Sequence, residues 1–382
     1  MKLSKYILAS AVALFASATV SYADLVVNIT GATAFRAAAH TSIIAALGGA
    51  GVTQYAFSTA TGAAAANLAT ADRAIFVGTV ANIPGTVTVR ASWSGSTAGI
   101  ASVVNATTVS VPLLNTTVSI TGVNGIGTVA NNFQAVVPKF SFSDVAQAAS
   151  NTPTPALTGN QVGVVPFQFI AQKGAPLGIT NMTDQLHAAL YSTGSVPLST
   201  FTGSSADEAT LVVATGRNNG SGTRVTILAE TGYGFNTTVQ QFQPTITGVT
   251  PNSSITSLGS ATNNGYSSNS GVRIVLEANP LPGFLVASYL TISDATQAIA
   301  NGAKGLTYNG VPYSVANVVN GQYSLWGYQW FYQAAGLNAD ETEFVTSFVA
   351  AIPANLGTAG IPIPDMKVTR QGGDGGPIFT NL

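Results

Sequence analysis

The sequence contains no cysteine and only two histidines, His40 and His187. Without cysteine the chain forms no disulfide, no thiolate metal site and no lipid thioether. Neither histidine has a second ligand at a spacing typical of metal sites, and no Gly-x-Ser-x-Gly motif marks a nucleophilic serine. We therefore predict that the protein is not an enzyme, that it uses no cofactor or metal, and that both histidines lie at the surface or partly buried.

Charge is the second thing that the sequence has little of. Charged residues make up 7% of the chain, whereas soluble domains typically contain about 25%. Hydrophobic residues make up 46%, and disordered chains are poor in them, so the low charge does not indicate disorder. Gly, Ala, Ser, Thr and Asn take the place of charged residues. Such a surface indicates a protein outside the cytoplasm, and one that could pack against neighbouring molecules.

The first 23 residues are typical of a secretory signal peptide. Lys2 and Lys5 form a positive start, residues 7–20 are apolar, and Ser21-Tyr22-Ala23 is a small-x-small cleavage site. No other stretch has the roughly 18 consecutive apolar residues of a membrane-spanning helix. Cleavage would leave 11 basic against 14 acidic residues, a net charge of −3. We expect an exported, periplasmic or secreted protein that does not bind nucleic acid, because no basic patch can be assembled.

The remaining chain alternates apolar strands with small-residue turns and helix-like stretches. Residues 25–30 form the first expected strand, 31–35 a turn and 36–47 a helix, which indicates an α/β architecture. Thr33, in this turn, is either a ligand for an anion or a helix cap. About 359 residues exceed what one hydrophobic core usually supports, so two lobes are expected.

A second strand and turn are followed by an uncharged region. Residues 74–77 and 87–91 are expected strands, and Ser94 to Ile100 form a Gly/Ser turn before a helix. Residues 101–132 are rich in Thr, Val and Asn with a period of two, which predicts a β-rich insert. Residues 140–143 then form a strand that ends at Asp144. That carboxylate is either a helix cap or a ligand-facing group.

The stretch Gly216 to Thr223 carries the clearest functional signal. It reads Gly-Arg-Asn-Asn-Gly-Ser-Gly-Thr, follows an apolar strand (211–214) and precedes a helix (224–230). A turn of this kind offers backbone N–H groups, two hydroxyls and the planar guanidinium of Arg217 to an oxyanion. The alternative is a surface turn, since this composition is also common in turns.

Several further features mark the second half of the chain. We expect a linker or turn at 151–155, a strand that restarts the pattern at 162–170, a polar turn before a helix at 263–272, a buried strand at 282–289, an aromatic strand or crossover at 326–332, and a loop at 371–376. The aromatic run is interpreted as core packing between lobes, with an aromatic cage as the alternative.

Taken in order, these motifs resemble the phosphate-binding proteins of ABC-type phosphate importers, which have the type 2 periplasmic-binding-protein fold. The resemblance rests on Ile29-Thr30-Gly31-Ala32-Thr33 with Phe35, on 95–100, on Phe142-Ser143-Asp144 and above all on 217–223. It implies a two-lobed α/β fold with a hinge. Lobe 1 would comprise 24–162 and 323–382, with the insert at about 101–132, and lobe 2 would comprise 163–322.

The resemblance also implies a set of phosphate-binding residues. Asp144 would accept a hydrogen bond from a protonated phosphate oxygen, and so reject a fully deprotonated anion such as sulfate. Arg217 would supply positive charge, and a backbone N–H near Phe35 would donate to the anion. The remaining donors would be Thr33, Ser96, Ser221, Gly222 and Thr223.

The implied function is capture of phosphate for uptake by an ABC importer. A surface or self-assembling structural protein that keeps this fold, with a weak or lost anion site, is the alternative. The low charge, the expected insert and the lack of a lipid anchor favour that alternative.

Overall fold

The computed structural model of the chain describes residues 24–57, 71–108, 113–115, 125–126, 133–250 and 252–381. The expected signal peptide, residues 1–23, lies outside them, as does most of the expected insert at 101–132.

One mixed sheet of twelve strands organises the fold. Its central strands are parallel, with β1 paired to both β4 and β8, whereas β18 is antiparallel to β8 and β9. Along the sheet the order is β11 (Ser195–Pro197), β12 (Leu211–Ala214), β15 (Phe284–Thr291), β9 (Thr158–Ala171), β18 (Trp326–Gln333), β8 (Phe140–Ser143), β1 (Leu25–Gly31), β4 (Val87–Ser92), β3 (Arg73–Gly78), β2 (Thr53–Phe57) and β6 (Gly125–Ile126), with β16 (Lys304–Gly305) also paired to β9.

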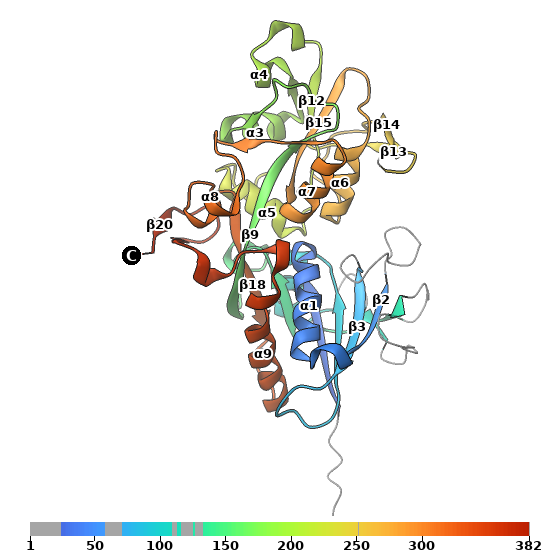
Figure 1. The fold of residues 1–382 in the computed structure, drawn as a ribbon, viewed down its shortest axis with the longest axis vertical. Helices are drawn as coiled ribbons and strands as arrows, with labels where there is room; N and C mark the ends of the chain where they lie inside the picture. Colours follow the sequence, from blue (N-terminus) through green and yellow to red (C-terminus); the bar gives the residue numbers. More distant parts are fainter. Residues whose placement is uncertain are drawn as a thin grey trace, which may run out of the picture.

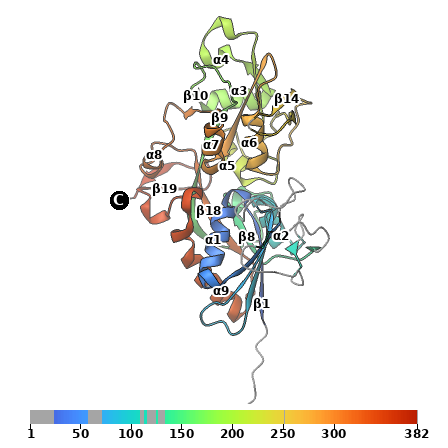
Figure 2. The same cartoon turned by 45° about the vertical axis from the view of Figure 1, so that its right-hand side comes forward.

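The sheet is divided between two lobes, which are stacked along the long axis in Figure 1. Strand β9 joins them, since its first half pairs with β18 and its last residues pair with β15. The turned view in Figure 2 keeps the same separation, with β1 and α9 in one lobe and α3, α4 and α6 in the other. The aromatic run at 326–332 is therefore a strand at the junction, as predicted, and Trp326 is fully buried.

Helices cover the faces of the sheet, and none of those described is both long and apolar enough to cross a membrane. They are α1 (Arg36–Ala46), α2 (Ser96–Val104), α3 (Asp184–Thr193), α4 (Ser199–Thr202), α5 (Gly222–Glu230), α6 (Asn269–Glu277), α7 (Ile292–Ala300), α8 (Val315–Val319) and α9 (Ala339–Ala351). Each of the four expected turns leads into a helix (α1, α2, α5 or α6), but α2, α5 and α6 begin at Ser96, Gly222 and Asn269, inside the expected turns. Ser221 and Ser268 cap α5 and α6, because their hydroxyls accept from backbone N–H groups in the first turn.

Smaller two-stranded sheets lie outside the main one. They pair β10 (Asn181–Met182) with β17 (Thr307–Tyr308), β13 (Thr245–Thr247) with β14 (Ser254–Ser257), β19 (Val368–Arg370) with β20 (Ile378–Thr380), and β5 (Leu113–Leu114) with β7 (Phe133–Gln134).

The prediction that the β-rich insert starts at residue 101 is wrong for its first residues. Helix α2 continues through Val104, and Ile100 and Val103 on it are buried. Burial of this apolar face against the sheet outweighs the β preference of its valines. Further along, Leu113–Leu114 and Gly125–Ile126 are short strands, and the described residues 105–108 and Asn115 are neither helix nor strand. The remaining parts of the expected insert, 109–112, 116–124 and 127–132, lie outside the described residues.

Both histidines are more deeply buried than predicted. His40 is 2% exposed, and its Nε2 accepts from Trp93 Nε1 at 2.9 Å. His187 is fully buried, stacks on Tyr191 with ring centroids 4.5 Å apart, and has no hydrogen-bond partner for either ring nitrogen among the described residues. Both imidazole rings pack against aromatic side chains. The sequence does not reveal this, because a single histidine without a motif does not show whether it is buried.

His187 makes the stability of the protein depend on pH. Burial lowers the pKa of His187 from 6.5 to about 3. The unfolded chain therefore takes up this proton first, so the contribution of His187 to stability is complete above about pH 6.5 and is lost as pH falls towards 3. We expect urea unfolding of His187→Phe to depend less on pH between 7 and 4 than wild type, by up to about 1.4 kcal/mol per pH unit. Equal slopes for the two proteins would contradict this role.

Candidate anion-binding site

The carboxyl ends of parallel strands bring the expected site residues to one edge of the sheet. Strands β1 and β8 are parallel neighbours in register, with Gly31 beside Phe142, so Thr33 and Asp144 follow at the same edge. Strand β12 of the other lobe leads into the Gly216–Thr223 turn and then α5. Ligands of open α/β sheets bind outside the carboxyl ends of strands, which is where these turns lie.

Asp144 lies at the centre of the first cluster and is 1% exposed. Its Oδ1 accepts from Ser96 Oγ, at the start of α2, and its Oδ2 accepts from Thr223 Oγ1 at 3.0 Å. A third hydroxyl, Thr226 Oγ1 of α5, donates to the backbone carbonyl of Asp144 at 2.9 Å. The carboxylate is thus held by both lobes, and the two lobes meet at this residue.

Close approach of the two lobes depends on Gly222. A Cβ atom at this position would lie 1.7 Å from Asp144 Oδ1 and 2.5 Å from Ser96 Oγ. Gly95 makes a similar approach, since a Cβ there would lie 2.5 Å from the carbonyl oxygen of Gly220. Thr97 N donates to that same carbonyl at 3.3 Å. The glycines of both turns therefore let the backbone of one lobe contact the other.

Arg217 forms the second cluster and is also 1% exposed. Its Nη2 donates to Thr33 Oγ1 at 3.1 Å, which is a further contact between the lobes, and to Ser267 O at 2.8 Å. Its Nε donates to Tyr266 O at 3.1 Å. Nη1 is buried and has no acceptor in the part of the chain that the structure describes. A buried cationic donor without an acceptor is costly, and an oxyanion would supply one.

Burial shifts the pKa of each of these two residues, Asp144 and Arg217, in one direction, and the charge of the other residue shifts it in the opposite direction. Burial raises the pKa of Asp144, against the hydrogen bond from Ser96, the charge of Arg217 and the hydrogen bond from Thr223. Burial also lowers the pKa of Arg217 to about 10, against the charge of Asp144. Arg217 therefore remains protonated at neutral pH. The site combines a stable positive charge with one carboxylate among hydroxyl and N–H donors.

The sequence left open whether Thr33 and Asp144 cap helices, and the structure shows that they do not. Thr33 does not cap α1, whose N-cap is Phe35, and its hydroxyl accepts from Arg217 instead. Asp144 caps no helix, since the next helical turn begins after Ala146 without a side-chain cap. Ser221, which was expected to donate to the anion, serves as the cap of α5 with its Oγ 3.4 Å from Arg224 N.

Phe35 contributes its ring to the core of the first lobe. The ring packs against Phe142 at 5.2 Å between centroids, and the backbone N–H donates to Ala32 O at 3.4 Å. Its expected role as a backbone donor to the anion stays a prediction.

The sequence did not point to the residues that hydrogen-bond to the backbone of Arg217. Tyr289 OH accepts from Arg217 N at 3.3 Å, and Gln241 Nε2 donates to Arg217 O at 2.9 Å. Arg224 Nη1 reaches the same carbonyl at 3.4 Å and Asn263 O at 2.7 Å. The Asn-rich turn 263–269 was recognised as a turn, but no spacing in the sequence links it to Arg217.

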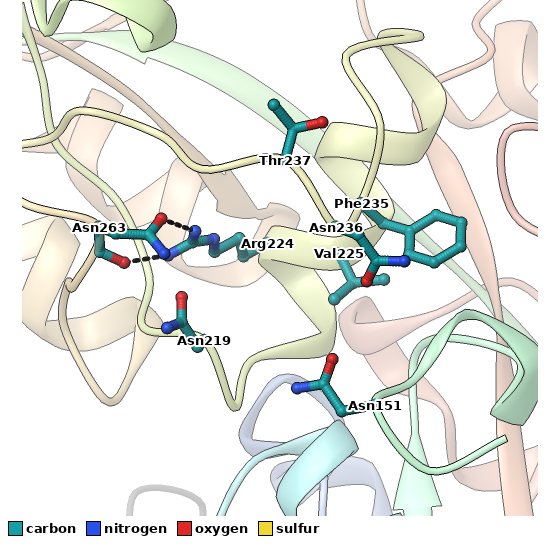
Figure 3. Close-up of a pocket in the computed structure, with 8 residues that line it drawn as sticks. All are labelled: Asn151, Asn219, Arg224, Val225, Phe235, Asn236, Thr237 and Asn263. Carbon is teal, nitrogen blue, oxygen red and sulfur yellow. Dashed lines mark hydrogen bonds between the residues drawn. The ribbon is translucent and has the colours of Figure 1, made fainter.

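A polar cavity of about 160 Å³ lies behind this turn, and Arg224 lines it. Figure 3 shows the guanidinium of Arg224 pointing to Asn263, to which it donates. The lining residues are Asn151, Asn219, Arg224, Val225, Phe235, Asn236, Thr237 and Asn263. None of the expected phosphate ligands lines this cavity, so it is distinct from the site between the lobes.

Two lobes of one α/β sheet, with turns that meet at the carboxyl ends of the strands, define the architecture of the type 2 periplasmic binding proteins. The predicted fold class is confirmed by a solved structure of this kind. The putative phosphate ABC transporter substrate-binding protein of Clostridium perfringens, with bound phosphate, matches with a TM-score of 0.50 and 14% identity, covering 88% of this chain and 99% of that one.

Two further proteins are similar to the chain. The chain is 32% identical over 108 residues to the phosphate-binding protein PstS of Bacillus subtilis, which covers 28% of this chain and 33% of PstS. The matched region thus spans about a third of the length of this curated relative. An ABC-type phosphate transport receptor of Vibrio cholerae gives a TM-score of 0.49 at 12% identity, covering 88% of this chain and 100% of that one. No family model matches the chain.

Proposed function

We propose that the protein captures inorganic phosphate between its two lobes. The observation that carries this proposal is the pairing of one buried carboxylate, Asp144, with the buried guanidinium of Arg217, surrounded by hydroxyl donors from both lobes. Phosphate would lie between the two lobes, and both would bind it in place of their direct contacts with each other. Ser96, Thr223 and Thr33 would then donate to its oxygens, together with backbone N–H groups at Phe35 and in the first turn of α5 around Ser221 and Gly222.

The lobes that close on the anion would be residues 24–162 with 323–382, and residues 163–322. Strands β9 and β18 connect them, and a hinge motion about these strands would open the site. We propose that the protein works outside the cytoplasm, delivers phosphate to an ABC importer and performs no catalysis. The name of the curated relative, a phosphate-binding protein, supports phosphate as the ligand.

Asp144 should set the selectivity of the site. Its carboxylate would accept a hydrogen bond from a protonated oxygen of HPO₄²⁻ or H₂PO₄⁻ but repel sulfate, which has no O–H to donate at neutral pH. In Asp144→Asn we expect sulfate to bind at least about tenfold more tightly than in wild type, because an unpaired buried acceptor costs about 1–3 kcal/mol.

Isothermal titration with phosphate and with sulfate measures this selectivity. Asp207→Asn is the matched control, since Asp207 accepts from Thr202 in the other lobe at 2.6 Å, away from the site. Submillimolar phosphate binding by the wild-type protein supports the proposal. Absence of phosphate binding, or an Asp144→Asn protein that still rejects sulfate, counts against it.

The second candidate is a surface or self-assembling protein with a lost anion site. The low fraction of charged residues, 7%, is the observation that favours it. Light scattering after size-exclusion chromatography separates the two candidates. A monomer that binds phosphate agrees with uptake, whereas self-association without phosphate binding agrees with assembly.

A further inference from the structure

The C-terminal hairpin packs at the junction of the two lobes. It comprises β19, β20 and the loop 371–377, and both views place β19 or β20 beside the junction, near α8. Met366 and Val368 at its base are buried, and Lys367 N donates to Val319 O at 3.0 Å. This hairpin was recognised in the sequence only as a glycine-rich loop.

Arg370 fastens the hairpin to the start of β18, the strand that pairs with the lobe-joining strand β9. Its Nη2 donates to Ser324 O at 2.9 Å and to Trp326 O at 3.3 Å, and its guanidinium lies 4.4 Å from the Trp326 ring centroid. Its Nη1 forms an ion pair with Glu230 Oε2 at 2.7 Å. The two side chains are only 3% and 2% exposed, so the pair is shielded from water and salt.

The tip of the hairpin contacts both lobes at once. Asp374 Oδ2 accepts from Ala146 N at 2.7 Å, two residues after Asp144 in the first lobe. Gly375 N donates to Glu230 Oε1 at 2.8 Å, at the end of α5 in the second lobe. The first turn of α5 carries Gly222 and Thr223, which contact Asp144. The tip therefore joins the segment that contains Asp144 to the helix that contacts it from the second lobe.

We propose that the C-terminal hairpin is a strap that holds the lobes closed, with Asp374 and Gly375 as positioning residues for the anion site. This proposal rests on the proposed function for its effect on phosphate. In the closed form the strap bonds to Ala146 and Glu230 together, whereas an opening of the lobes that separates these two residues must break one of the bonds. The strap thus stabilises the closed form relative to the open form and raises the apparent affinity for phosphate.

Two substitutions weaken the strap at residues outside the expected set of phosphate-binding residues. Asp374→Ala removes the acceptor for Ala146 N, and Asp374→Asn restores an acceptor oxygen. Gly375→Ala places a Cβ 2.5 Å from the carbonyl oxygen of Ala229, in a backbone conformation (φ +74°) that disfavours side chains. Gln371→Ala, at an exposed position of the same loop, is the matched control.

The test measures how far the two lobes close, with and without phosphate. Small-angle X-ray scattering of the phosphate-free proteins should give a larger radius of gyration for Asp374→Ala and Gly375→Ala than for Gln371→Ala, with faster amide exchange at Ala146. Phosphate titration should give a dissociation constant about tenfold higher for Asp374→Ala, largely recovered in Asp374→Asn. The scattering and exchange arms need no phosphate, so they test the strap even if the protein binds none.

Two outcomes would overturn the strap. One is a scattering curve and an Ala146 exchange rate in Asp374→Ala that equal those of Gln371→Ala. The other is a dissociation constant for phosphate that is unchanged while exchange at Ala146 is faster, which would limit Asp374 to a local role in the first lobe.

Discussion

Replacing Arg217 with alanine is expected to weaken phosphate binding by between about a hundredfold and a few thousandfold, which corresponds to about 3–5 kcal/mol for leaving a buried anionic group without the cation that compensates it. The guanidinium is 1% exposed and bridges the lobes through Thr33, and its Nη1 has no acceptor among the residues that the structure describes. Alanine would leave Asp144 as a buried carboxylate without this cation, and its charge would repel the incoming anion. Isothermal titration with phosphate measures the loss.

The matched control for Arg217 removes a positive charge far from the site. Lys304 donates to the carbonyl oxygens of Pro176 and Leu177 in the second lobe, and Lys304→Ala should bind phosphate as wild type does. Circular dichroism and urea unfolding verify that both variants are folded. If folded Arg217→Ala bound phosphate as tightly as Lys304→Ala, the guanidinium would not be part of the site.

Replacing Gly222 with alanine is expected to raise the dissociation constant for phosphate by between about fivefold and about 150-fold, because overpacking typically costs about 1–3 kcal/mol. The added methyl would fall 1.7 Å from Asp144 Oδ1. It would displace the carboxylate and keep α5 away from Ser96, so that the lobes could not close. Gly222 does not have a positive φ, so the backbone itself tolerates alanine and the effect is steric.

Gly220 is a control within the same turn. A Cβ there would meet Ala98 Cβ at 3.5 Å, which is an ordinary contact, and its φ is not positive either. Gly220→Ala should therefore bind phosphate nearly as wild type does. Equal losses in both variants would indicate that any alanine stiffens the turn, and the close approach of Gly222 to Asp144 would not be the cause.

The local elements could be read from the sequence because local chemistry determines them. Residues 25–30 are β-branched and apolar before a glycine, and they form β1. A helix was expected at 224–230, and α5 forms there, although Ser221 was assigned to the anion and not to the N-cap that it provides. The extent of α2 was misjudged, because Val103 prefers a strand by propensity and yet packs against the sheet as part of a helix.

The candidate site was only partly predictable. The resemblance of the motif order to the phosphate-binding proteins was enough to group Thr33, Ser96, Asp144 and Arg217. Their partners depend on contacts between residues far apart in the chain. Tyr266 and Ser267 hold Arg217 through backbone carbonyl groups, which every residue has, so their identity carried no signal.

By itself the sequence determined the low charge, the alternation of strands and turns, and the donors that these turns present. Side-chain chemistry and local propensity are properties of short segments, so they can be recognised without the fold. Only the tertiary structure decided that Asp144 and Arg217 are buried, that Gly222 contacts the carboxylate, and that Asp374 reaches Ala146 across 228 residues of chain. Burial and long-range contacts depend on how distant segments pack, and packing shifts the pKa of each site residue and brings the two lobes together.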